Sequence, residues 1–169
     1  MEDFKIYENA EKLFAENDCV GMENCIFIAR KDANQVGAQA GLSSTLGLAG
    51  SAIAGAIAKG DALENIYYDG FLINQTEKGF GFIPLWNKGI VLTFNLEKME
   101  AKSNNFFFVS FYDIEKISVK KLSFINSKIK KLKIILKNGA KIQLLVSVKE
   151  KAVSYHEENF ERFLQKYEV

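Results

Sequence analysis

Few residues of this chain could carry out acid–base, nucleophilic or metal chemistry. His156 is the only histidine, and Cys19 and Cys25 are the only cysteines. Zinc sites and Cys–His nucleophilic pairs are built from these residue types, so the inventory is too small to support either. His156 lies one helical turn before Phe160 on an apolar face, which is typical of a packed histidine. We therefore expect no bound transition metal and no catalytic histidine.

The other candidates for catalysis are equally weak. The carboxylate pairs Asp113/Glu115 and Glu157/Glu158 occupy positions that are typical of solvated strand and helix faces. A Ser-His-Asp triad would lack a nucleophile-elbow motif. The glycines of residues 37–60 do not have the spacing of a phosphate-binding or dinucleotide-binding loop. We predict that the chain is not an enzyme and binds no cofactor.

Composition predicts one globular domain spanning residues 1–169. Hydrophobic residues make up 48% of the chain and charged residues 25%, and Pro84 is the single proline. The spacing of Cys19 and Cys25 fits neither a disulfide framework nor a metal finger, which favours a reducing compartment. The acidic first residues contain no apolar stretch typical of a secretory signal, so a cytoplasmic location is expected. Frequent Lys, Asn, Ile and Phe are typical of AT-rich bacterial genomes.

Charge is distributed unevenly although the net charge is only +1. Residues 116–151 contain eleven lysines and one acid, Glu150, whereas residues 1–24 contain seven acids and two lysines. This asymmetry indicates either an anionic partner or complementarity between the two ends of the chain. Composition does not decide between them.

Two amphipathic helices are expected at the ends of the chain. In residues 1–24, a helical face is formed by Ile6, Ala10, Leu13 and Phe14. Near the other end, one face of a second helix contains Val153, His156, Phe160, Phe163, Leu164 and Tyr167, and Ser154 with Glu157 matches a capping box.

Strands with a period of two follow from Gly70 onward. The strand candidates are 71–76, 80–85, 90–94, 106–109, 114–119 and the hairpin 131–137/140–146, with 25–30 as a further strand. Three connections end in glycine, at 77–79, 87–89 and 137–139, as a three-residue hairpin loop prefers. In the last hairpin a three-residue loop pairs Ile134 with Ile142 and Leu132 with Leu144, which keeps all apolar residues on one face.

Residues 33–60 form a Gly/Ala-rich insertion that lacks charge between 33 and 58. Its glycines disfavour an isolated helix, so we expect a helix only if another element packs on its small-residue face. Reversible membrane insertion or helix self-association is the alternative, because the small residues recur at four-residue spacing. As a transmembrane span the segment contains too many polar and too few bulky apolar residues.

The strand and helix signals together resemble the pleckstrin-homology-like (PH-like) superfold found in bacterial PH and GRAM-type domains. The resemblance covers about residues 70–168, with Cys25–Arg30 as a further first strand, and it places the barrel core and capping helix in residues 66–169. It depends on Gly70-x-Leu72-x-x-x-Thr76-x-x-Gly79-x-x-Phe82, Phe111-Tyr112-Asp113-Ile114-x-x-Ile117, Lys137-Asn138-Gly139 and Asn159-Phe160-x-x-Phe163-Leu164. It implies an α+β protein with an antiparallel β-barrel of about seven strands capped by the C-terminal helix. It also implies a non-enzymatic module that binds lipid head groups or peptides.

Lysines on one hairpin face are the best candidate for a binding surface. Lys131, Lys133 and Lys141 share the outward face with Ile135 and Leu145, and Arg30 with Lys31 ends the first strand. Such lysines also keep an exposed sheet face in solution. As binding groups they would meet an anionic membrane or an acidic protein or peptide; nucleic acid is disfavoured because no arginine or aromatic residue interleaves them. Residues 70–77 contain no basic residue, so the resemblance gives no support for phosphoinositide recognition.

The sequence thus predicts a PH-like binding module of unidentified ligand and oligomeric state. The alternative is a peripheral membrane protein that uses the Gly/Ala segment and the lysine face together. A further expectation is that the N-terminal helix packs over the outward face of the lysine hairpin, mainly through Leu13 and Phe14, and that Glu8, Glu11 and Glu16 neutralise part of it. The alternative is that this helix packs on the Gly/Ala segment and leaves the lysines to an anionic partner.

Overall fold

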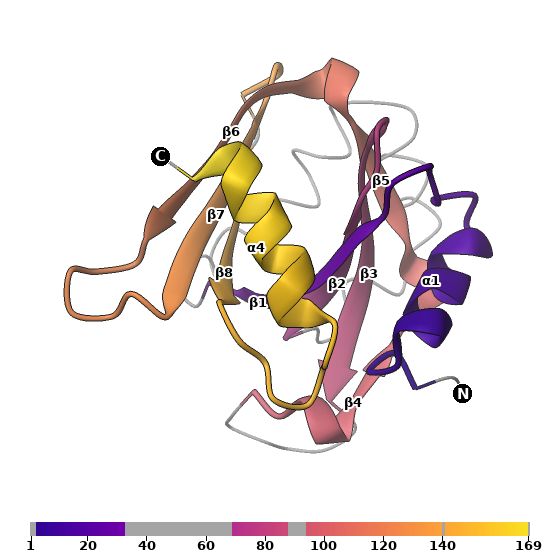
Figure 1. Cartoon of the computed structure of the whole chain (residues 1–169). Coiled ribbons are helices and arrows are strands. Elements are labelled where there is room, and N and C mark those ends of the chain that lie inside the picture. Colours follow the sequence, from indigo (N-terminus) through magenta and orange to yellow (C-terminus); the bar gives the residue numbers. More distant parts are fainter. Residues whose placement is uncertain (1–2, 33–68, 88–93, 140, 169) are drawn as a thin grey trace.

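The computed structural model describes residues 3–32, 69–87, 94–139 and 141–168, which form an α+β protein with one antiparallel sheet and two α-helices (Figure 1). The sheet order is β4-β3-β2-β1-β8-β7-β6, with β5 paired to β3. The described elements are α1 (Tyr7–Ala15), β1 (Cys25–Lys31), β2 (Gly70–Gln75), β3 (Gly79–Asn87), β4 (Met99–Ala101), β5 (Phe107–Ser110), β6 (Ile114–Lys121), β7 (Ile129–Leu136), β8 (Lys141–Ser147) and α4 (His156–Tyr167), with short 3-10 turns at Leu96–Lys98, Ser103–Asn105 and Phe111–Asp113.

The sheet differs from the expected barrel in two respects. Among the described residues it has eight strands instead of about seven, and its end strands β4 and β6 do not pair with each other, so the described sheet is not closed. The additional short strand β4 was not expected from the sequence. The expected strand at 90–94 lies almost wholly outside the described residues, as do the turn at 87–89, apart from Asn87, and the Gly/Ala insertion at 33–60.

The inner face of the sheet packs against α4 through aromatic side chains. Phe160 and Phe163 are fully buried, and their rings lie 5.3 and 4.9 Å from that of Phe27 on β1. Apolar residues that alternate along β7 and β8 line the same core, among them Leu132, Ile134, Leu136, Ile142, Leu144 and Val146. The prediction that Phe160 and Phe163 are buried against the sheet is confirmed.

A second core lies on the opposite, outer face of β1–β3. Ala10, Leu13 and Phe14 of α1 cluster there with residues such as Ile28 and Leu72. No described residue of β6, β7 or β8 belongs to this cluster. The expectation that the N-terminal helix covers the lysine hairpin is therefore wrong: α1 packs where the outward side chains of the sheet are apolar.

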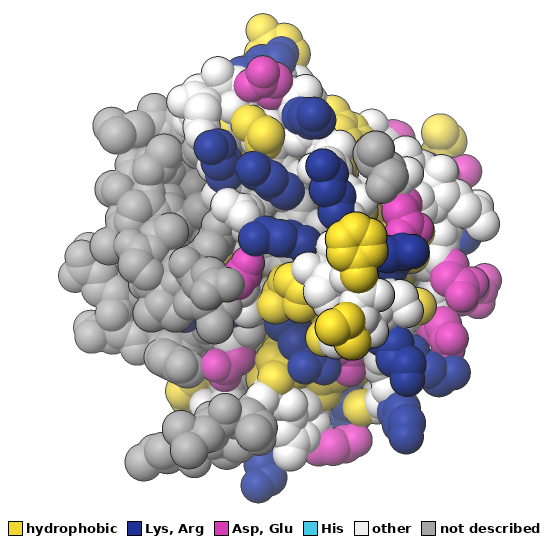
Figure 2. Space-filling model, turned by 90° about the vertical axis from the view of Figure 1, so that its left-hand side faces the viewer, with side chains coloured by type: hydrophobic (Ala, Val, Ile, Leu, Met, Phe, Trp, Pro, Cys, Tyr) yellow, Lys and Arg dark blue, Asp and Glu magenta, His cyan; other side chains and the backbone are white. Residues whose placement is uncertain are grey.

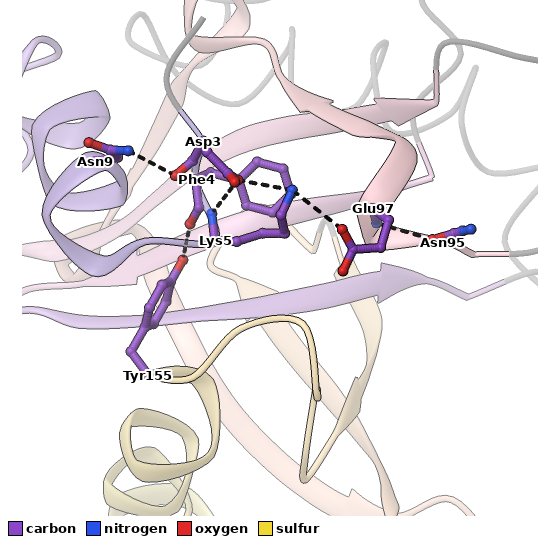
Figure 3. Close-up of polar contacts among 7 residues, drawn as sticks. All are labelled: Asp3, Phe4, Lys5, Asn9, Asn95, Glu97 and Tyr155. Carbon is purple, nitrogen blue, oxygen red and sulfur yellow. Dashed lines mark hydrogen bonds and ion pairs between the residues drawn. The ribbon is translucent and has the colours of Figure 1, made fainter.

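The segment that leads into α1 is fixed by polar contacts to distant parts of the chain (Figure 3). The Tyr155 hydroxyl, just before α4, donates a hydrogen bond to the Phe4 carbonyl oxygen. Lys5 forms an ion pair with Asp3 at 3.0 Å and lies 4.0 Å from the Glu97 carboxylate. These contacts connect the N-terminal segment to the start of α4 and to the turn before β4.

Side chains of α4 complete the hydrogen bonding of β1. Only Arg30 and Lys31 of β1 pair with β8, so the rest of this strand edge has no neighbour among the described strands. There the Ile28 amide donates to His156 Nδ1 at 3.0 Å, and Asn159 Nδ2 donates to the Ile26 carbonyl at 2.9 Å. Because these backbone groups are buried, α4 supplies the partners that an adjacent strand would give.

Two hairpin loops that the sequence predicted have different outcomes in the structure. The β7–β8 register pairs Ile134 with Ile142 and Leu132 with Leu144, as predicted, and Gly139 has φ +88°. The predicted three-residue loop at 77–79 is wrong by one residue. The Thr76 amide donates to the Gly79 carbonyl, so the hairpin loop contains only two residues, Glu77 and Lys78.

The expected capping box is also absent. Helix α4 begins at His156, and its N-cap, Tyr155, makes no side-chain capping bond.

Candidate functional site

The histidine and the two cysteines considered first for catalysis are buried, and both ring nitrogens of His156 are hydrogen-bonded. His156 accepts a hydrogen bond at Nδ1 from Ile28, and its Nε2 donates to the Ser147 carbonyl at 2.7 Å, which fixes the neutral tautomer. Burial lowers the pKa of His156 below its ordinary value. Burial raises the pKa of Cys19 to about 12 and that of Cys25 to about 11, so both thiols stay protonated at neutral pH.

No group of three or more metal-ligating side chains occurs within the described ranges. Of the helices that the structure describes, none combines the length and the apolar character needed to cross a bilayer.

Basic side chains form a regular array on the outer face of β6–β8. Because antiparallel partners project to the same side, the register fixes which residues are neighbours. One row crosses from Lys120 through Lys131 and Leu145 to Arg30, a second contains Ser118, Lys133 and Gln143, and a third contains Lys116, Ile135 and Lys141. We call Arg30, Lys116, Lys120, Lys131, Lys133 and Lys141 the basic face.

Acidic residues neutralise only one edge of the basic face. Lys131 lies 3.2 Å from the carboxylate of Asp32, which is itself buried. Arg30 forms an ion pair with Glu150 at 3.0 Å, and its guanidinium lies 4.5 Å from the centre of the Phe94 ring. These contacts restrain two of the cations at the β1 edge.

The other four cations of the basic face are differently placed. Lys116, Lys120 and Lys141 are exposed and Lys133 is half-buried. Within the part of the chain that the structure describes, none of the four forms an ion pair. Figure 2 shows this side of the molecule, where Lys and Arg side chains gather on the described surface. The positive charge of these four lysines is therefore not offset by an ion pair with any described residue.

The structure brings together four of the five residues expected at the site. Arg30, Lys131, Lys133 and Lys141 share the basic face. Lys31 does not, since it pairs with Leu144, whose side chain lies in the core on the opposite side of the sheet. Burial lowers the pKa of Lys31, and nearby Asp69 opposes this effect.

Sequence reasoning missed Lys116 and Lys120. The signal was present, because these lysines alternate with Ile117 and Val119 along β6, and Val119 is buried. What the sequence did not supply was the pairing of β6 with β7, which places them beside Ile135 and Lys131.

Comparison of the chain with protein-family models, with curated proteins and with solved structures finds no match in any of the three.

Proposed function

We propose that this chain is a non-enzymatic, PH-like binding module that binds a polyanionic partner through the basic face. The observation that carries the proposal is the set of four lysines, on three adjacent strands, that form no ion pair with a described residue. Ile135 and Leu145, both half-buried, lie between these cations and add apolar contact area.

The spacing of these lysines favours a partner with several negative charges. Lys133 is the diagonal neighbour of Lys116, Lys120 and Lys141 on the adjacent strands. Diagonal neighbours lie about 7–8 Å apart, which is comparable to the Debye length of about 8 Å at physiological salt. Their potentials add, and a single carboxylate could neutralise only one of them. A surface or chain that carries repeated phosphate or carboxylate groups fits the array better.

The PH-like part of the proposal draws on sequence and architecture together. The sequence resembles that superfold, and the observed sheet is antiparallel, with a C-terminal helix packed on its inner face. The engaged nitrogens of His156 support a role without catalysis. The free thiols of Cys19 and Cys25 fit a reducing cytoplasmic location.

Binding to immobilised heparin at graded salt tests the proposal. The variant Lys116→Gln/Lys120→Gln/Lys133→Gln/Lys141→Gln should bind about 10- to 100-fold more weakly at low salt, since each exposed ionic contact contributes about 0.2–1 kcal/mol. The matched control removes the same charge at the exposed Lys78, Lys98, Lys151 and Lys166. If both variants lose affinity equally, net charge alone governs binding and the proposal fails.

A further inference from the structure

The loop between β6 and β7 exposes two large apolar side chains at its tip. Phe124 is 107% exposed and Ile125 is 99% exposed, while Leu122 beside them is 43% exposed. In Figure 1 this loop, drawn in orange at the left, projects away from the body of the molecule. We call Phe124 and Ile125 the apolar tip.

The loop has a defined conformation that presents the apolar tip. Ser123 Oγ accepts a hydrogen bond from the Asn126 amide at 3.0 Å, and Asn126 Oδ1 accepts one from the Lys128 amide at 3.2 Å. At its base the Leu122 amide donates to the Ile129 carbonyl at 3.1 Å. Since the polar side chains bond within the loop, they fold the turn and leave the two apolar side chains directed outward.

Lysines surround the base of this loop. Lys120, Lys121 and Lys128 are exposed, and none forms an ion pair with a described residue. Lys130 is paired with Glu168 and Lys131 with Asp32, so these two are already neutralised. Lys120 also belongs to the basic face, so the loop adjoins that face through this lysine, whereas Lys121 pairs with Lys130 on the other side of the sheet.

We infer that the anionic partner is a lipid bilayer and that the β6–β7 loop inserts the apolar tip between its headgroups. This inference rests on the proposed function and names the partner of the same face. Apolar side chains at a projecting point, with lysines behind them, match the layering of a bilayer surface, in which anionic headgroups lie above acyl chains.

Other partners fit this geometry less well. A stable protein interface usually buries about 1,200–2,000 Å² on a broad, complementary surface, whereas here the exposed apolar residues lie at the point of a loop. Bases of single-stranded nucleic acid stack on successive aromatic rings, and the tip offers one ring beside an aliphatic side chain. Of these partners, a bilayer makes the fullest use of Phe124 and Ile125, both exposed, together with the lysines.

Vesicle flotation of the full chain tests the inference. Two vesicle types are used, phosphatidylcholine alone and phosphatidylcholine with about one third phosphatidylglycerol. Wild type should float with the anionic vesicles only. The variant Phe124→Ser/Ile125→Ser keeps every charge, and we expect it to bind anionic vesicles about thirtyfold more weakly because burial of the two side chains is lost. Met22→Ser, at a residue 94% exposed outside this loop, is the matched control and should bind like wild type.

Insertion itself is measured with a fluorophore at the loop. In Ser127→Cys the new thiol is exposed, whereas Cys19 and Cys25 are buried, so a nitrobenzoxadiazole label attaches selectively. Anionic vesicles should shift its emission to the blue, and spin-labelled acyl chains should quench it. The same label on Ser154→Cys, an exposed position before α4, should show neither effect.

The outcomes separate this inference from the proposed function. Loss of vesicle binding with unchanged heparin binding in Phe124→Ser/Ile125→Ser supports insertion. Unchanged vesicle binding in that variant, or an unquenched label at residue 127, overturns insertion but leaves the polyanion-binding face intact. Binding of wild type to heparin without binding to anionic vesicles excludes the bilayer as partner. Binding to neither probe contradicts the proposed function as well.

Discussion

The two halves of the outer sheet face have opposite chemistry although they belong to one sheet. On β1–β3 the outward side chains include the apolar residues Ile26, Ile28 and Leu72, which cluster with α1, and Arg30 at the end of β1 belongs to the basic face. On β6–β8 the outward side chains are mainly lysines, and the described residues provide no helix over them. The inner faces do not differ in this way, since both halves contribute buried apolar residues to the core with α4.

This difference shows which features the fold requires. The alternating apolar residues of β7 and β8 fill the inner core, so the fold depends on them. The outward lysines make no contribution of that kind, and placing several like charges on adjacent strands is unfavourable. The proposed binding function would account for the array, and differences between the two halves in stability and in lysine protection test it.

The largest effect is expected on the inner face, which both halves share. Phe160→Ala should lower the free energy of unfolding by about 3–5 kcal/mol, because the ring is fully buried against Phe27. Urea unfolding measures this change. Phe124→Ala is the control and should change stability by less than about 0.5 kcal/mol, as the ring is exposed. A loss below about 1 kcal/mol for Phe160→Ala would mean that α4 is peripheral to the fold.

A matched pair of isoleucines compares the two outer halves directly. Ile28→Ala, under α1, should destabilise the protein by about 2–4 kcal/mol, since Ile28 is 1% exposed. Ile135→Ala, on the half-buried position between Lys116 and Lys141, should cost less than about 1 kcal/mol. Equal losses in urea unfolding would show that the lysine-bearing half is covered as fully as the other, and would argue against an open binding face.

A smaller effect is expected at the edge of β1 that α4 covers. His156→Phe removes the acceptor for the Ile28 amide and the donor for Ser147, so we expect a loss of about 1–3 kcal/mol at pH 8. Burial places the pKa of His156 below the ordinary value of 6.5. The unfolded chain therefore binds the proton more tightly, and the stability contributed by the neutral ring is present above about pH 6.5 and lost as the pH falls.

The measurement for this prediction is unfolding of both proteins at a series of pH values. The stability difference between wild type and His156→Phe should shrink as the pH falls below 6.5, the ordinary pKa of the only histidine. A difference that stays constant with pH would show that the ring is not held neutral by its burial.

The sequence predicted the elements whose pattern is local. Alternation in residues 131–146, together with the glycine at 139, fixed the β7–β8 register, and the apolar stripe of α4 located Phe160 and Phe163 in the core. Ser154 and Glu157 match the spacing of a capping box, which would place the N-cap at Ser154. The prediction failed because the helix begins later, at His156, with Tyr155 as its N-cap. Tyr155 and His156 make hydrogen bonds to distant residues, Phe4 and Ile28, at the point where the helix starts. The spacing of a capping motif carries no information about such contacts, so it did not give the first residue of the helix.

The candidate site was harder to predict from the sequence than the fold, because it depends on contacts between distant segments. The hairpin lysines Lys131, Lys133 and Lys141 were predicted correctly to share a face. The predicted position of α1 was wrong. β1 pairs with β2, which is distant in the sequence, and this pairing creates the apolar surface on which the helix packs. The apolar tip was overlooked because two exposed apolar residues in a short loop differ from core residues only once the loop is seen to project.

Footprinting of lysines on the full chain tests the account most directly. An amine-reactive reagent, applied with and without anionic vesicles and read by mass spectrometry, reports which lysines the partner covers. We predict protection at Lys116, Lys120, Lys133 and Lys141, and at Lys121 and Lys128 around the apolar tip. Lys78, Lys98 and Lys166 should be equally reactive in both states. Protection centred on Lys78 and Lys98, with the basic face still reactive, would contradict the assignment of the binding surface to β6–β8.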